Sequence, residues 1–152
     1  GYFNAGVTPL ESDMDFIRDA LDTNLLGAWR MVKAFATLLR KSGHGRVVNV
    51  TSGAGSFSDP VFGLPVHRQN VPVYGITKLA LNGLTVKLAL QLKADNILVN
   101  SVCPGFVATY PGTADWGARP VSEGAAGIVW AATLPDNGPS GGLFRDGEVL
   151  GW

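Results

Sequence analysis

The chain has 152 residues, of which 46% are hydrophobic and 16% are charged, and its twelve basic residues balance twelve acidic ones. This length and composition suit one globular α/β domain with its own core, and the balanced charge, without a block of Lys and Arg, argues against a nucleic-acid partner or an anionic membrane patch. The single cysteine, Cys103, excludes an internal disulfide and no Cys/His cluster has metal-ligand spacing, so the sequence predicts a cytoplasmic protein without a metal site.

Short strands and long helices alternate along the chain. The opening "YFN" is typical of a strand, and a helix is expected over about Ser12 to Ser42, where "SGHG" ends the pattern. Apolar residues recur in this helix at steps of one, three or four: Phe16, Ile17, Leu21, Leu25, Trp29, Val32, Phe35 and Leu39. No apolar run approaches the ~18 residues that a membrane span needs, so no membrane contact is expected.

The later elements continue this alternation. "RVVNVT" at Arg46 to Thr51 and "ILVNSVC" at Ile97 to Cys103 are predicted buried strands, with a helix over about Tyr74 to Asp95 between them. A shorter helix is expected over about Ser122 to Leu134, and "LFRDGEVL" is expected to form a last strand. Strands that alternate with long helices favour parallel pairing with right-handed crossovers, hence an α/β fold with an open, doubly wound, mostly parallel sheet.

Ligands of such a sheet bind beyond the carboxyl ends of its strands. The loops after Asn4, Thr51 and Cys103 therefore lie on the rim where a functional site is expected. The turn "CPG" ends its strand sharply and lets the backbone approach a flat ligand, although Pro-Gly is also ordinary turn chemistry.

The helix at 74–95 is apolar on two sides. At about 100° per residue, Leu81, Leu84, Leu88 and Leu92 form one stripe. Leu79, Val86 and Leu90 lie nearly opposite. One side is expected to cover the sheet, and the other to meet a partner subunit or a covering loop.

One glycine pattern imitates a dinucleotide-binding loop. "TSGAGSFSD" follows a strand and contains Gly53 and Gly55, but Ser58 stands where a third glycine belongs and Pro60 interrupts any following helix. No Asp or Glu occurs between Asp59 and Asp95 to hold a ribose hydroxyl. We therefore do not interpret this segment as the phosphate loop.

Tyr74 and Lys78 in "VYGITK" are four residues apart, so on a helix their side chains share one face. A free phenol has a pKa near 10, and lowering it to about 7 takes roughly 4 kcal/mol, part of which a nearby ammonium can supply. Taken alone, this spacing more often marks a surface pair than a catalytic one.

Two further residues add to this pair. Ser52 closes a strand on the expected rim, where its hydroxyl can hydrogen-bond a carbonyl oxygen, although a serine there also satisfies turn backbone. Asn24 lies in the middle of a helix, where Asn has poor propensity, and Gly27 follows it. Such an unfavourable residue in a helix interior often has a reason.

Five segments together, in order, resemble the motifs of the short-chain dehydrogenase/reductase family. They are "FNAG" at Phe3 to Gly6, "TNLLG" with Asn24, "VVNVTSGAG" with Ser52, "YGITK" with Tyr74 and Lys78, and "NSVCPGFVAT" with Asn100, Pro104, Gly105 and Thr109. Any one of these matches could arise by chance, but the ordered set on the expected elements is specific.

The resemblance implies a Rossmann-type sheet, NAD or NADP as cofactor, and a catalytic tetrad. Tyr74 would be the general acid or base, Lys78 would bind the nicotinamide ribose and lower the tyrosine pKa, Ser52 would orient the substrate carbonyl, and Asn24 would hold a proton-relay water. Asn4 to Gly6 would line the adenosine side, and Pro104 to Thr109 would cradle the carboxamide and phosphates. The implied cofactor-binding residues are Asn4, Ala5, Gly6, Tyr74, Lys78, Pro104, Gly105, Val107 and Thr109.

The chain departs from the family pattern in three places. The family's glycine-rich loop and first three strands precede the N-A-G segment, whereas only Gly1 precedes Tyr2 here, and Phe3 stands where a second Asn is usual. We therefore expect residues 1–152 to form a single domain, the C-terminal part of a Rossmann-type oxidoreductase domain, from a partial sequence or a truncated protein rather than a natural short one. The long segment between Ser52 and Tyr74, and the C-terminal region, resemble carbonyl-reductase-like members.

The resemblance implies an enzyme that interconverts a small-molecule ketone and an alcohol. It leaves NAD and NADP, and the identity of the substrate, as alternatives. Phe106, Tyr110 and Trp116 are candidates to line an apolar pocket or simply to close a lid. A homo-dimer or tetramer through the helix at 74–95 is expected. The alternative function is a catalytically silent truncated form that acts as a binding or oligomer-assembly module.

Overall fold

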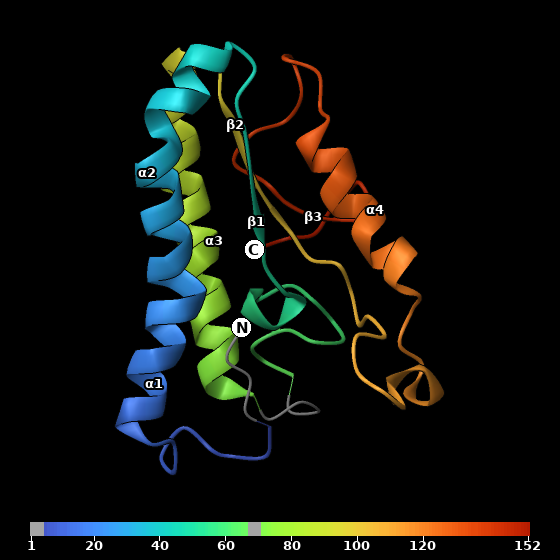
Figure 1. Cartoon of the computed structure of the whole chain (residues 1–152). Helices are drawn as coiled ribbons and strands as arrows, with labels where there is room; N and C mark the ends of the chain where they lie inside the picture. Colours follow the sequence, from blue (N-terminus) through green and yellow to red (C-terminus); the bar gives the residue numbers. More distant parts are fainter. Residues whose placement is uncertain (1–4, 67–70) are drawn as a thin grey trace.

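A four-stranded sheet runs through the computed structural model, which describes residues 5–66 and 71–152 (Figure 1). The strands lie in the order β1 (Arg46–Val50), β2 (Leu98–Val102), β3 (Leu143–Arg145) and β4 (Glu148–Val149). The first three are parallel, and β4 returns antiparallel beside β3. Every residue of β2 is buried, as expected for an inner strand of a parallel sheet covered on both faces.

Helices cover both faces of this sheet. The chain forms α1 (Met14–Leu21), α2 (Gly27–Ser42), α3 (Pro72–Leu92) and α4 (Val121–Ala132). In Figure 1, α2 and α3 lie side by side on one face and α4 lies on the other. The short helices are the π-helix η1 (Asp22–Leu26) and the 3₁₀ turns η2 (Gly53–Gly55), η3 (Lys93–Asp95) and η4 (Thr113–Trp116). The predicted doubly wound, mostly parallel α/β arrangement is confirmed.

The long first helix is interrupted. Asp13 caps it, because its side chain accepts hydrogen bonds from the backbone N–H groups of Asp15 and Phe16. Gly43 ends it with a φ of 72°, at the predicted "SGHG" stop. Between these ends, η1 replaces one regular turn with a wider π turn, so the single helix predicted over Ser12 to Ser42 is three segments.

The strand β1 lies at one edge of the sheet, and β4 lies at the other. None of the strands in residues 5–66 and 71–152 pairs with the outer side of β1, and Val50 is 43% exposed. The predicted strand "YFN" and the cofactor-binding candidate Asn4 lie outside the described residues.

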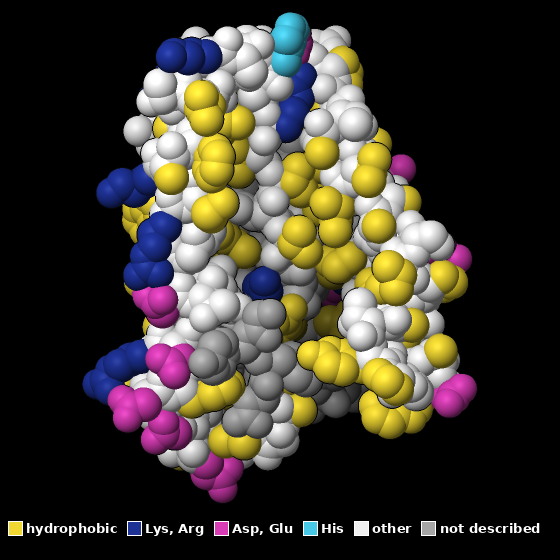
Figure 2. Space-filling model, viewed as in Figure 1, with side chains coloured by type: hydrophobic (Ala, Val, Ile, Leu, Met, Phe, Trp, Pro, Cys, Tyr) yellow, Lys and Arg dark blue, Asp and Glu magenta, His cyan; other side chains and the backbone are white. Residues whose placement is uncertain are grey.

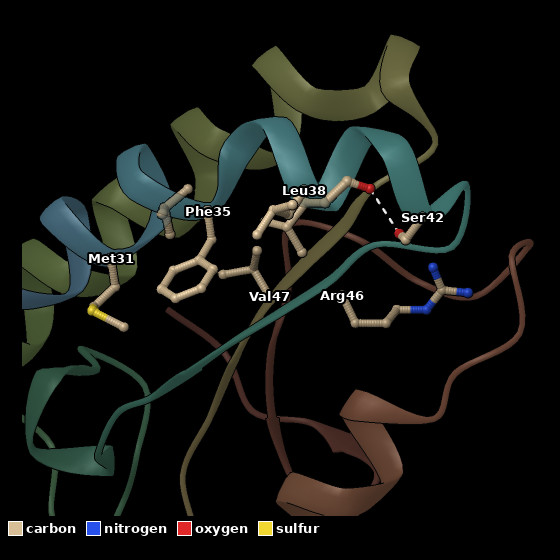
Figure 3. Close-up of a pocket in the computed structure, with 8 residues that line it drawn as sticks. Met31, Phe35, Leu38, Ser42, Arg46 and Val47 are labelled. Carbon is tan, nitrogen blue, oxygen red and sulfur yellow. Dashed lines mark hydrogen bonds between the residues drawn. The ribbon is translucent and has the colours of Figure 1, made fainter.

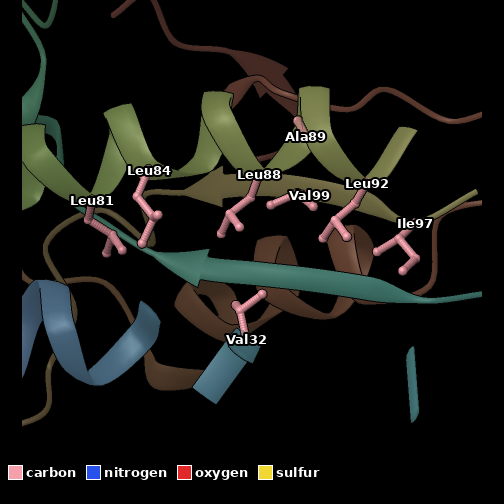
Figure 4. Close-up of a cluster of buried hydrophobic side chains, with 8 residues drawn as sticks. All are labelled: Val32, Leu81, Leu84, Leu88, Ala89, Leu92, Ile97 and Val99. Atoms are coloured by element: carbon pink, nitrogen blue, oxygen red, sulfur yellow. The ribbon is translucent and has the colours of Figure 1, made fainter. Parts of the chain in front are cut away.

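The core forms between α3 and the sheet (Figure 4). The predicted stripe on α3 faces inward and packs with Ile97 and Val99, which are 1% and 0% exposed, and Val32 joins it from α2. On the opposite side of α3, Leu90 is 66% exposed, so the described chain leaves part of the second stripe uncovered. The buried cluster consists of Val32, Leu81, Leu84, Leu88, Ala89, Leu92, Ile97 and Val99.

An apolar groove runs between α2 and β1. Its volume is about 370 Å³, and its walls include Met31, Phe35, Leu38 and Val47, with Arg46 at one end (Figure 3). Hydrophobic side chains also gather on both sides of the hollow between α2 and α4 (Figure 2). Trp29 and Phe35, two of the apolar residues that recur in the predicted helix, are 44% and 46% exposed. No helix among the described residues is long and apolar enough to cross a membrane.

Candidate active site

Ser52 and Tyr74 meet where β1 ends and α3 begins. Ser52 has an extended backbone and caps η2, and its hydroxyl oxygen accepts a hydrogen bond of 3.2 Å from the N–H of Ala54. Tyr74 lies in the first turn of α3, which begins at Pro72, a residue favoured at that helix position. A side-chain hydrogen bond joins Ser52 to Tyr74. The structure thus brings together two residues 22 positions apart in the sequence, on the predicted rim.

The turn that carries Ser52 packs closely against α3. A Cβ at Gly55 would lie 2.6 Å from the backbone of Lys78 and Leu79, so only glycine allows this approach. Asn82 strengthens the contact because its side-chain N–H donates to the Gly55 carbonyl at 3.0 Å. The second glycine of "GAG" therefore has a packing role.

Lys78 reaches from α3 to the end of β1. Its Nζ donates to the carbonyl oxygen of Val50 at 3.0 Å and lies 5.5 Å from the centre of the Tyr74 ring. Burial lowers the pKa of the ammonium, while the nearby sulfur of Cys103 raises it. The ammonium thus lies beside the phenol, in a partly desolvated place where its charge acts strongly.

Asn24 is buried on the π turn η1. Its side-chain N–H donates to the hydroxyl of Thr77 at 3.0 Å, and that hydroxyl donates to the carbonyl oxygen of Tyr74 at 2.8 Å. Asn24, which the sequence places unfavourably in a helix interior, lies in this wider turn. Such π turns occur frequently at functional sites. Sequence reasoning did not identify Thr77; its position three residues after Tyr74, on the same face of α3, was the available signal.

The pKa of Tyr74 is raised above its usual value. Burial is the largest cause, the hydrogen bond with Ser52 lowers the pKa in part, and the electrostatic interaction with the Cys103 side chain raises it. This direction differs from the lowered pKa that the family resemblance implied for the phenol. At neutral pH the phenol is therefore protonated and can donate a proton.

A second groove, of about 400 Å³, opens beside these residues. It is lined by Asn24 and Lys78 together with the exposed side of β1, including Val50. The groove runs along the edge of β1 from Val47 to Val50, and its Lys78 end lies at the carboxyl end of the strand, where ligands of open α/β sheets bind.

The loop after β2 also reaches this rim. Gly105 turns the chain with a φ of 78° after the half-buried Pro104. Val107 forms an isolated β-bridge with Arg119, and the exposed Thr109 follows it. The bridge ties the predicted cofactor loop to the segment at Arg119.

The other predicted ligand-binding residues are less enclosed. Ala5 and Gly6 lie in the exposed segment before α1. Tyr110 and Trp116 are 77% and 78% exposed and Phe106 is 39% exposed, so these three aromatic side chains do not enclose a pocket in the described structure. No group of three or more metal-ligating side chains occurs among the residues that the structure describes.

Three residues that sequence reasoning left out lie beside the site. Cys103 is buried, and its sulfur accepts hydrogen bonds from the N–H of Gly53 at 3.1 Å and from Arg145 at 3.3 Å. Arg145 in turn pairs with the buried Asp59. The sequence around Asp59 does not indicate that its partner lies 86 positions further along the chain.

This fold is shared with solved structures of carbonyl reductases and dehydrogenases. The model of the short chain dehydrogenase family matches residues 2–116, most of the chain, and the chain belongs to that family. The resemblance stated from the motifs is thereby confirmed. Membership assigns the chain to a family of dehydrogenases.

Individual relatives agree with this assignment. The chain is 34% identical over 139 residues to the short-chain dehydrogenase anuI of Penicillium roqueforti, an alignment that covers 86% of this chain and 55% of that protein. It is 46% identical over 85 residues to carbonyl reductase [NADPH] 3 of Rattus norvegicus, covering 52% of this chain and 30% of that one. The NADPH-bound carbonyl reductase from chicken fatty liver shares the fold, with a TM-score of 0.81 at 22% identity over 100% of this chain and 63% of its own. The chain therefore spans less than two thirds of the length of these relatives.

Proposed function

We propose that this protein is an NAD(P)-dependent oxidoreductase that interconverts a carbonyl compound and an alcohol, with Tyr74 as general acid and base. The observation that carries the proposal is the contact of Tyr74 with both Ser52 and Lys78 at the carboxyl rim of the sheet. A proton donor, a hydroxyl that can orient a carbonyl oxygen, and a partly desolvated cation are the groups that this reaction requires.

In carbonyl reduction, the neutral Tyr74 phenol donates its proton to the substrate oxygen while Ser52 holds that oxygen by a hydrogen bond. The reduced form of NAD or NADP would supply, when bound, the hydride that the carbonyl carbon receives, and the oxidised form would accept the hydride in the reverse direction. Alcohol oxidation reverses the proton transfer, so the phenolate accepts the proton. Lys78 then stabilises the negative charge on Tyr74, and Asn24 fixes the helix turn beside it through Thr77.

The groove beside Asn24 and Lys78 fits the nicotinamide end of the cofactor. The ammonium of Lys78 lies at the wall of this groove, and the loop from Pro104 to Thr109 borders the same rim. We therefore assign these residues to cofactor binding, together with Ala5 and Gly6. Asn4 belongs to the same assignment and lies outside the described residues. Small ketones or alcohols are the proposed substrates, a class consistent with the carbonyl reductase relatives.

Three further expectations accompany this function. We propose that the 152 residues form one domain, the C-terminal part of a Rossmann-type oxidoreductase domain, and that it acts in the cytoplasm. We also propose a homo-dimer or tetramer through α3, because Leu90 on its second stripe is exposed. Light scattering of wild type and Leu90→Asp tests the oligomer.

The test of the function is Tyr74→Phe in the full-length protein, assayed by NADPH consumption with a panel of small ketones. Loss of the proton donor should lower kcat at least ~100-fold with the fold intact by circular dichroism. Tyr110→Phe, which changes an exposed phenol, is the matched control and should keep wild-type activity. Full activity of Tyr74→Phe would refute the proposal. Absence of both NADH and NADPH binding in a calorimetric titration would favour the silent binding module.

A further inference from the structure

A buried ion pair lies directly behind the turn that carries Ser52. The side chain of Asp59 has 0% exposure and pairs with Arg145 of β3, whose side chain is 22% exposed. Asp59 lies in the loop between Ser52 and α3, whereas Arg145 lies near the C-terminal end of the chain. The pair therefore fastens this loop to the sheet.

Asp59 also orders its own loop. One carboxylate oxygen accepts hydrogen bonds from the N–H groups of Val61 at 2.9 Å and Phe62 at 3.0 Å, while the N–H of Asp59 donates to Ser56 at 3.0 Å. Burial raises the pKa of the Asp59 carboxyl, but the hydrogen bonds from Phe62 and Val61 and the charge of Arg145 outweigh it, so the pKa is lowered. The carboxylate is thus charged at neutral pH.

Gly53, the residue after Ser52, rests against this pair. A Cβ at Gly53 would collide with the Asp59 carboxylate and would lie 2.5 Å from the Arg145 guanidinium, so the ion pair fills the space where a side chain would stand. The N–H of Gly53 and the guanidinium of Arg145 both donate to the sulfur of Cys103. Movement of Arg145 would therefore release Gly53 on two sides.

We propose that the Asp59–Arg145 pair is a positioning element that holds the Ser52 hydroxyl at its place beside Tyr74. Ser52 is adjacent to Gly53 and caps the three-residue turn η2, which is too short to fix its own geometry. This inference rests on the proposed oxidoreductase function, because positioning of Ser52 matters only for a reaction in which Ser52 takes part.

The first experiment is a double-mutant cycle in the full-length protein. Arg145→Met should lower kcat about 10- to 100-fold, as expected for a catalytic group misplaced by about 1 Å, with less than a twofold change in the KM for NADPH. In the Ser52→Ala background the same substitution should lower kcat by less than about threefold, because the group it positions is gone. Equal losses in both backgrounds would overturn the inference.

A matched control separates positioning from stability. Arg46 forms an ion pair with Asp136 at the opposite end of β1, and its side chain is 11% exposed. Arg46→Met therefore removes an arginine–aspartate pair, whose Asp136 is 43% exposed, without touching Gly53 and should leave kcat unchanged. If Arg145→Met does not fold, Asp59→Asn combined with Arg145→Met removes both charges and avoids a lone buried charge. That variant should show the same loss of kcat and the same dependence on Ser52.

A second experiment needs no turnover. Cys103 is the single cysteine of the 152 residues, so alkylation of this chain by iodoacetamide reports on one buried thiol. Arg145→Met should speed alkylation at least tenfold, and Arg46→Met should not; an unchanged rate would overturn the inference. If Tyr74→Phe retains full activity, the proposed function fails and the positioning role falls with it. If Tyr74→Phe is inactive but the cycle is additive, only the positioning role fails.

Discussion

Replacement of Thr77 by Val isolates the connection between η1 and α3. Thr77 has 0% exposure, and Val has nearly the same shape, so the change removes a hydroxyl without opening a cavity. The hydroxyl accepts from Asn24 at 3.0 Å and donates to the Tyr74 carbonyl oxygen at 2.8 Å. Both hydrogen bonds are lost together.

The magnitude follows from these two bonds. Each buried hydrogen bond contributes about 0.5–1.5 kcal/mol net, and an amide left short of a buried partner adds a desolvation penalty. We therefore expect the free energy of unfolding to fall by about 2 kcal/mol, which for a chain of this size lowers the Tm by about 4–8 °C.

Urea denaturation followed by circular dichroism measures this change directly. Thr133→Val is the matched control, because the Thr133 hydroxyl bonds to the Val129 carbonyl on an exposed helix end, where water replaces it. The control should change stability by less than about 0.5 kcal/mol. An effect of Thr77→Val no larger than that of the control would refute the idea that this hydroxyl joins the π turn to α3.

Two further predictions concern the core and the pH profile. Leu92 is 3% exposed, and Leu92→Ala should lower the free energy of unfolding, measured in urea, by about 2–5 kcal/mol. Leu90, in the same helix, is 66% exposed, and Leu90→Ala should have little effect at low protein concentration. Equal effects of the two substitutions would contradict the assigned core. Because the pKa of Tyr74 is raised above its usual value of 10.0, the kcat of alcohol oxidation should climb with pH from about 8 to beyond 10 as the phenolate forms, while the kcat of carbonyl reduction stays level from about pH 6 to 8. An oxidation rate that does not depend on pH in this range would contradict Tyr74 as the base.

The sequence was sufficient to predict the regular elements because local chemistry specifies them. The buried strands show as apolar runs, and the stop at Gly43 follows from its left-handed backbone. The proximity of Ser52 and Tyr74 was also predictable, because each adjoins an element whose direction in a parallel sheet is known.

Other features depend on interactions that no local pattern contains. The exposure of Trp29 and Phe35 depends on which elements cover the sheet beyond β1, and periodicity specifies only that a side is apolar. The partner of Asp59 comes from β3, and a loop carboxylate gives no indication of which arginine will reach it. The raised pKa of Tyr74 likewise results from burial in the folded chain, which residue spacing does not reveal.

The π turn η1 changes the rotational alignment of α1 relative to α2. Ala20, Asn24, Ala28 and Val32 follow one another at steps of four, and all four are buried or half-buried. In a regular α-helix such steps drift by about 40° each, so three of them would carry the stripe about 120° around the axis. The extra residue in the wide π turn reverses about 100° of this rotation of the stripe around the axis. The helix can therefore keep one continuous face toward α3, and a single-residue deletion here would rotate the whole of α1.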